Sequence, residues 1–195
     1  LISPQTGWRE LAETVLDCPA RRADSPALGA CYQHADAINI TGYFSGCLHE
    51  SEATIRGWLA EGQSAALARA FTQLEHGGQI PDCDDNLDRT IDTYAFFERL
   101  AAARGLELYV YESGTHFEYS GAPEIQQLLV DMTRDQRMYD LYLRNFVSFR
   151  VLGGRTLNVW GWISPNDAWA NSDSLLDLTH PKYRAIGNFS GLNAR

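Results

Sequence analysis

The chain has 195 residues, of which 45% are hydrophobic and 21% charged, and its formal net charge is −9. This composition is typical of a folded domain and excludes a disordered protein. Its acidity argues against binding to the nucleic-acid backbone. No apolar run approaches the roughly 18 residues that span a bilayer. We therefore expect neither nucleic acid nor a membrane as a partner.

Lysine and cysteine usage narrows the chemistry further. Lys182 is the single lysine beside 15 arginines, so any lysine nucleophile would have to be this residue. The four cysteines contain no C-x-x-C pair, which argues against a zinc ribbon. The sequence leaves open whether they form two disulfides or are buried thiols. Phosphate-loop, dinucleotide, G-x-S-x-G and H-E-x-x-H motifs are missing from the sequence, so we expect no metal and no cofactor.

Hydrophobic periodicity predicts helices and strands in turn along the first part of the chain. We expect a short helix over 8–17, a loop over 21–29, a strand over 35–44 and a long helix over 52–75. Leu1-Ile2 could be the stub of a further strand.

The second part repeats this alternation. We expect a helix over 86–104, a strand over 106–111, a helical region over 123–151 that breaks near Thr133, a strand over 156–163 and a short helix near 183–186.

Strands separated by helical connections predict the α/β class with a parallel sheet, either covered on both faces or closed into a barrel. Three or four such strands protect neither the faces nor the edges of a sheet well. We expect residues 1–195 to form a single unit that belongs to a larger assembly of strands. Because the chain starts with Leu1 and not Met, we also expect that more chain precedes it.

The segment YVYESGTHFEY contains the strongest candidate for chemistry, Glu112. A carboxylate at the C-terminal end of a parallel strand lies where α/β barrels have their active sites. Simple alternation predicts that Leu108 and Val110 share the face of Glu112, while Tyr109 and Tyr111 point to the helices. The alternative is a solvated glutamate that only ends the strand.

His116 follows Glu112 by four residues and could hydrogen-bond a carboxylate or a sugar hydroxyl. Glu118 reads as a solvated loop residue. On the first long strand, Asn39 and Tyr43 place polar groups on one face, where they could bind a ligand or buried water.

Asn158, Trp160 and Trp162 alternate along the last predicted strand and would share one face. Two large aromatic rings at a barrel mouth would form a platform for the apolar face of a sugar. Ordinary core packing is the alternative. Trp169 is a further candidate in the following loop.

Three segments, DAINITGYF, LYVYESGTH and DLTHPKYRAI, resemble the C-terminal half of bacterial glycoside hydrolases with a clan A (β/α)8 barrel. The resemblance covers roughly residues 30–190. It implies a partial (β/α)8 barrel comprising the last three to four βα units, without the N-terminal half. Glu112 would be the catalytic nucleophile, and the acid/base of the fourth strand would lie outside this chain. The resemblance suggests substrate binding by Asn39, Tyr43, His116, Asn158, Trp160 and Trp162.

We therefore expect part of a secreted, extracellular or periplasmic retaining hydrolase that cleaves O-glycosyl bonds of an oligo- or polysaccharide. Alone it would be almost inactive, and a missing N-terminal half-barrel would be its partner. Two alternatives stay open: a non-catalytic carbohydrate-binding barrel protein, and a self-contained small α/β protein in which Glu112 is structural.

Overall fold

A computed structural model describes residues 1–118 and 121–191, and these form a mixed α/β fold. Its sheet is parallel and has the order β1 (Ala37–Phe44), β2 (Glu107–Thr115), β3 (Thr156–Leu157). Ile2 forms a parallel bridge with Ile38, which confirms the predicted strand stub. The α/β prediction is thus confirmed at this level, while the sheet of the described residues remains open and does not close into a barrel.

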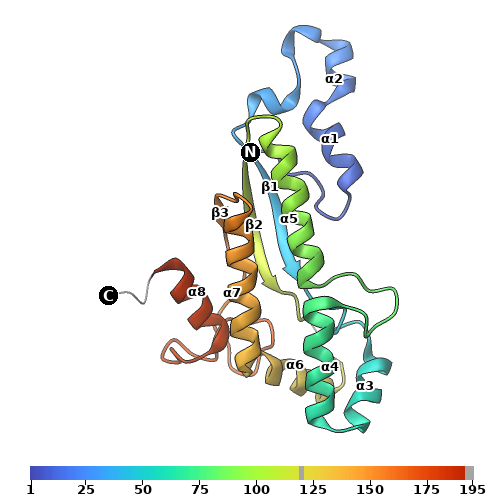
Figure 1. Ribbon diagram of the computed structural model, residues 1–195, viewed down its shortest axis with the longest axis vertical. Helices are drawn as coiled ribbons and strands as arrows, with labels where there is room; N and C mark the ends of the chain where they lie inside the picture. Colours follow the sequence, from blue (N-terminus) through green and yellow to red (C-terminus); the bar gives the residue numbers. More distant parts are fainter. Residues whose placement is uncertain (119–120, 192–195) are drawn as a thin grey trace.

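Helices line one side of the sheet and both of its ends. Figure 1 shows α5 and α7 along the strands, α1 and α2 at one end, and α3, α4 and α6 at the end to which the strands point. None of the helices in the described ranges is long and apolar enough to cross a membrane. The helices are α1 (Arg9–Asp17), α2 (Pro19–Asp24), α3 (Glu52–Ala60), α4 (Gln63–His76), α5 (Leu87–Ala102), α6 (Pro123–Arg134), α7 (Gln136–Val151) and α8 (Pro181–Ser190).

Two helix boundaries follow from local capping. The Asn86 side chain accepts a hydrogen bond of 3.0 Å from the Arg89 amide and starts α5 as predicted. The predicted break near Thr133 is confirmed, because Asp135 ends α6 and its side chain caps α7. These signals depend only on near neighbours, so the sequence displays them.

Two other predictions of local structure were wrong. The long helix over 52–75 is two helices, because Gly62 between them adopts φ +116°, which an α-helix cannot contain. The predicted loop over 21–29 is largely helical, since Pro19 starts α2 and a 3₁₀ turn follows at Pro26–Leu28.

The helix-facing side of the sheet is apolar and buried. Ile38 and Ile40 of β1 and Leu108 and Val110 of β2 pack in one core cluster with Tyr94, Phe97 and Phe149. Gly42 lies on the same face, where a Cβ atom would come 2.1 Å from the Tyr94 hydroxyl. The close fit of α5 against β1 therefore requires glycine there.

A β-bulge at Tyr111 reverses the predicted orientation of Glu112. Ile40 pairs with Val110, but its successor Thr41 pairs with Glu112, so Tyr111 is the extra residue and is 42% exposed. The bulge turns Glu112 to the face opposite Leu108 and Val110. The prediction that these three share a face was therefore wrong, because alternation fails across a bulge.

The last predicted strand is much shorter than 156–163. Its regular ladder ends at Leu157, although the Trp160 amide still donates a 2.9 Å hydrogen bond to the Ser113 carbonyl. Gly161 then adopts φ +145° and turns the chain away. A Cβ atom at Gly161 would come 2.4 Å from the Asn171 side-chain amide. Trp162 therefore leaves the line of the strand.

All four cysteines are paired, which decides the question that the sequence left open. Cys18 bonds to Cys31 and Cys47 to Cys83. The second disulfide joins the loop after β1 to the connection between α4 and α5.

Candidate functional site

The site is centred on a hydrogen bond between the two longest strands. The Tyr43 hydroxyl of β1 donates to Glu112 Oε2 of β2 at 3.0 Å. Both side chains are half-buried near the C-terminal ends of their strands. Burial first, and then the hydrogen bond and charge of Glu112, raise the pKa of Tyr43 well above its usual value. Tyr43 consequently remains a protonated donor to this carboxylate.

His116 extends the pair into an aromatic cluster. It follows β2 directly, and its amide donates 3.3 Å to the Phe44 carbonyl at the end of β1. Its ring centroid lies 5.4 Å from Tyr43, 5.4 Å from His49 and 4.7 Å from Trp169. His116 therefore lies between Tyr43 of β1 and Trp169 of the loop that follows β3.

Trp162 and Trp169 form the outer part of this cluster, with ring centroids 5.4 Å apart. Asp167 fixes both. Its Oδ2 accepts a hydrogen bond of 2.8 Å from Trp162 Nε1, and its Oδ1 accepts one of 2.9 Å from the Trp169 amide. Trp169 Nε1 is buried and makes no hydrogen bond within the described residues.

The two tryptophans line a cleft of about 490 Å³. Glu118, which the sequence suggested to be a solvated loop residue, is exposed as expected and also lines this cleft. Aromatic walls with a few polar groups are typical of small-ligand sites. The cleft residues are Phe117, Glu118, Gln126, Leu129, Trp162, Asn166, Asp167, Ala168 and Trp169.

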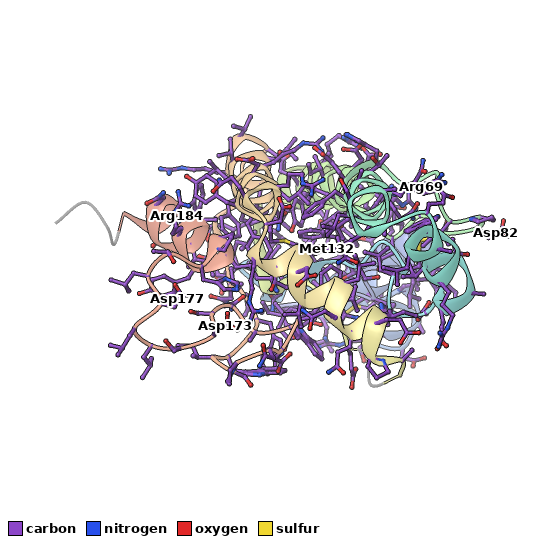
Figure 2. All side chains as sticks on the ribbon, turned by 90° about the horizontal axis from the view of Figure 1, so that it is seen from below. Arg69, Asp82, Met132, Asp173, Asp177 and Arg184 are labelled. Carbon is purple, nitrogen blue, oxygen red and sulfur yellow. A yellow bond between two sulfur atoms is a disulfide. The ribbon has the colours of Figure 1, made fainter. Side chains whose placement is uncertain are left out.

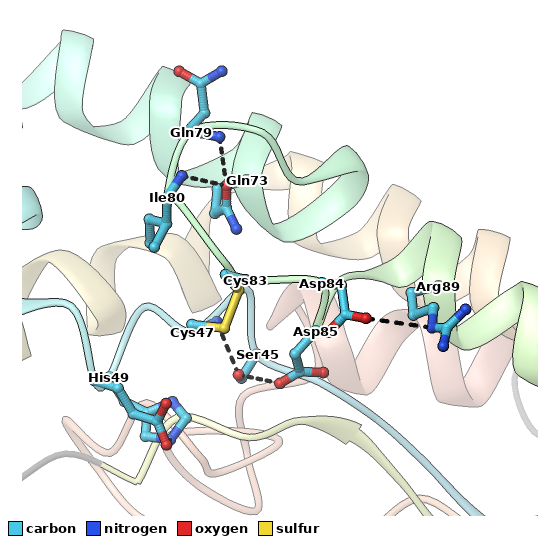
Figure 3. Close-up of a disulfide and its surroundings, with 11 residues drawn as sticks. Ser45, Cys47, His49, Gln73, Gln79, Ile80, Cys83, Asp84, Asp85 and Arg89 are labelled. Atoms are coloured by element: carbon cyan, nitrogen blue, oxygen red, sulfur yellow. Dashed lines mark hydrogen bonds and ion pairs between the residues drawn. A yellow bond between two sulfur atoms is a disulfide. The ribbon is translucent and has the colours of Figure 1, made fainter. Parts of the chain in front are cut away.

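The loop that carries His49 is held by the second disulfide (Figure 3). The Ser45 hydroxyl donates to the Asp85 carboxylate and accepts a 3.1 Å hydrogen bond from the Cys47 amide. Within this loop the His49 Nδ1 atom is buried without a hydrogen-bond partner in the part of the chain described. Burial lowers the pKa of His49. Burial thus favours the neutral imidazole of His49, whose ring contacts His116.

The predicted site residues separate into two groups. Tyr43, Glu112 and His116 come together, and Trp162 joins them through Trp169. Asn39 is half-buried beside Tyr109, nearer the other end of β1. Asn158 is exposed, and Trp160 is 45% exposed. Across the described ranges no side-chain hydrogen bond or ring contact joins these last three to Glu112.

Two contributors to the site were not among the predicted site residues. Asp167 orients both tryptophans, and Lys182 is completely buried under the same loop, with Nζ 2.8 Å from the Ala168 carbonyl. Nothing in the sequence distinguishes Asp167 from any other loop aspartate. Lys182 could have been singled out, because it is the single lysine in the chain.

The described residues contain no group of three or more His, Cys, Asp or Glu side chains that could hold a metal ion. The side chains that the site brings together are the Glu112 carboxylate, the Tyr43 phenol, the imidazoles of His49 and His116, and the two indoles with Asp167. Comparisons of the chain with protein-family models, with curated proteins and with solved structures found no match.

Proposed function

We propose that this chain carries the nucleophile half of a retaining glycoside-hydrolase site, within the C-terminal part of a (β/α)8 barrel. The observation that supports this best is the 3.0 Å hydrogen bond from Tyr43 to Glu112 at the C-terminal edge of a parallel sheet. A donor aimed at one carboxylate oxygen orients the other oxygen for attack. The neighbouring cleft supplies the aromatic surface on which a sugar ring stacks.

In the proposed reaction, Glu112 attacks the anomeric carbon and the leaving-group oxygen departs with the bonding electron pair. A natural leaving group needs a proton from a second carboxylic acid about 5–5.5 Å away. We place that acid outside this chain, on the strands that would complete the barrel. The isolated chain would then bind oligosaccharides but hydrolyse natural ones very slowly.

The sheet face opposite α5 is only partly covered, which is consistent with this proposal. The half-buried residues Asn39, Thr41, Tyr43 and Glu112 share that face. A parallel sheet is normally covered on both faces. The interior of a closed barrel would cover it.

An activated substrate tests the nucleophile without the missing acid. A 2,4-dinitrophenolate leaves without protonation, and a 2-fluoro substituent slows hydrolysis of the glycosyl-enzyme. We expect one of a panel of 2,4-dinitrophenyl 2-deoxy-2-fluoroglycosides (gluco, galacto, manno and xylo) to add one glycosyl unit to Glu112, detected by peptide mass spectrometry.

The chain offers a matched control for this experiment. Glu107 lies on the same strand and accepts a 2.9 Å hydrogen bond from Tyr109, but at the opposite end of the sheet. Glu112→Gln should abolish labelling, whereas Glu107→Gln should label like the wild type. Labelling of another carboxylate, or none with the whole panel, would contradict the proposal.

A non-catalytic carbohydrate-binding protein is the second candidate. The exposed indoles favour it, because Trp162 is 41% exposed beside the cleft and would bind a sugar without any reaction. Oligosaccharide binding without covalent labelling would support this candidate over the first. If neither occurs and Glu112→Gln only lowers stability, Glu112 is structural.

We also propose an extracellular or periplasmic location. The two disulfides are compatible with an oxidising compartment, where such bonds form and persist.

A further inference from the structure

Lys182 is more deeply buried than any arginine of residues 1–118 and 121–191. Its side chain is fully buried, while every arginine in the described ranges is at least partly exposed. Burying a cation is unfavourable unless its donors are satisfied. The chain has fifteen arginines and one lysine, and among those that the structure describes the lysine is the buried one. This difference indicates a requirement for a compact amine at this point.

The Lys182 amine binds the backbone of the loop that carries Trp169. Nζ donates hydrogen bonds of 2.8 Å to the Ala168 carbonyl and 3.2 Å to the Ala170 carbonyl. These carbonyls belong to the residues on either side of Trp169. The rings of Phe117 and Tyr142 lie 5.9 and 5.8 Å from Nζ, within the range of cation–π attraction.

The backbone on both sides of Trp169 is thereby attached to α8. Figure 2 shows the loop that carries Asp173 and Asp177 beside this helix, where Arg184 is labelled. Two N–H donors for two carbonyls are available in the neutral amine as well as in the ammonium form. A guanidinium is broader and planar and would not fit between two carbonyls and two rings in the same way.

We propose that Lys182 is a positioning residue that sets the Trp169 indole against His116 in the wall of the cleft. The chain of contacts runs from Lys182 to the backbone around Trp169, and from that indole to His116 at 4.7 Å. His116 in turn contacts Tyr43, the hydrogen-bond donor to Glu112. The importance of Lys182 for sugar binding depends on the proposed function, but its hold on Trp169 does not.

The test follows the Trp169 indole N–H signal by ¹⁵N NMR in the full chain. Trp169→Phe assigns that signal, and buried Trp58 of α3 serves as an internal reference. We expect Lys182→Met, which keeps the length but removes the donors, to shift the Trp169 signal and leave Trp58 unchanged. The same variant should weaken binding of a neutral hexasaccharide (cello-, manno- or xylohexaose) by about tenfold.

Ile186→Ala is the matched control. Ile186 lies on α8 and is half-buried against the core. This variant should lower stability without moving the Trp169 signal or the affinity. Lys182→Arg should move the signal as Lys182→Met does. An unchanged Trp169 signal in folded Lys182→Met would overturn the proposal. If no hexasaccharide binds the wild type, the proposed function fails, and the NMR signal still decides the role of Lys182.

A measurement on the wild type covers the case in which the variants fail to fold. Because Lys182 is the single lysine, reductive methylation should leave its amine unmodified in the folded chain and should modify it once the chain is unfolded in urea. Methylation of Lys182 at similar rates in the folded and the unfolded chain would show that the contacts of Nζ do not hold it.

Discussion

The Tyr43 hydroxyl and the Glu112 carboxylate, 69 residues apart in the chain, meet at 3.0 Å across β1 and β2. The contact exists because the bulge at Tyr111 brings Glu112 opposite Thr41 and onto the face of Tyr43. Strand pairing, rather than any local motif, therefore determines which groups surround this carboxylate.

Tyr43→Phe should weaken the site without unfolding the chain. Loss of a hydrogen bond to a charged group corresponds to about 1.5–3 kcal/mol, so we expect labelling of Glu112 by the activated fluoroglycoside to slow at least tenfold. The control is Tyr109→Phe, which removes the equivalent hydrogen bond to Glu107. Equal labelling rates for the wild type and Tyr43→Phe would show that this hydrogen bond does not activate Glu112.

Trp162→Ala and Trp169→Ala should each reduce oligosaccharide affinity. Aromatic contacts contribute about 0.5–1.5 kcal/mol beyond the buried area, so we expect each variant to lose at least about two- to tenfold in affinity, measured by calorimetry. Trp8 is exposed beside α1 and outside the cleft, which makes Trp8→Ala a suitable control. A similar loss of affinity in the control would place sugar binding elsewhere.

The two disulfides should differ in their contribution to stability. Cys47 and Cys83 are 36 residues apart, and Cys18 and Cys31 are 13 apart. Loop-closure entropy predicts losses of about 4 kcal/mol for the first pair and about 3 kcal/mol for the second when both cysteines become serine. Urea unfolding measures these losses. A larger loss for the Cys18–Cys31 pair would mean that loop length does not control the effect.

Lys182 should make stability depend on pH above neutrality. Burial lowers its pKa from 10.5 to about 7, although the charge of Asp167 opposes the shift. Between these two values the unfolded chain binds a proton that the folded chain does not, so the free energy of unfolding should rise with pH. The expected rise is of the order of a few kcal/mol over this range.

The pH experiment compares the wild type with Lys182→Met by urea unfolding from pH 7 to 9.5. This range avoids the titration of three other buried groups. Burial lowers the pKa of His180 below 6.5 and raises the pKa values of Tyr94 and Tyr142 above 10. Lys182→Met should lose the slope. The same slope in both proteins would assign it to another group.

Some features follow from the sequence because they depend on near neighbours. Asn86 caps α5, and Asp135 separates α6 from α7, since each side chain binds an amide within three residues. The strand over 35–44 has a pattern of β-forming residues and is observed as Ala37–Phe44. Glu112 and Tyr43 were candidates because each lies near the end of a predicted strand.

The amino-acid sequence by itself determined the order of the strands and of most helices, the α/β class and the candidate residues, because hydrophobic period and capping are local. Only the tertiary structure decided that Glu112 turns toward Tyr43, that the cysteines pair as they do, and that Lys182 lies under Trp169. Bulges, disulfides and buried amines depend on which distant segments pack together. No local period encodes that packing, because it minimises the free energy of the whole chain.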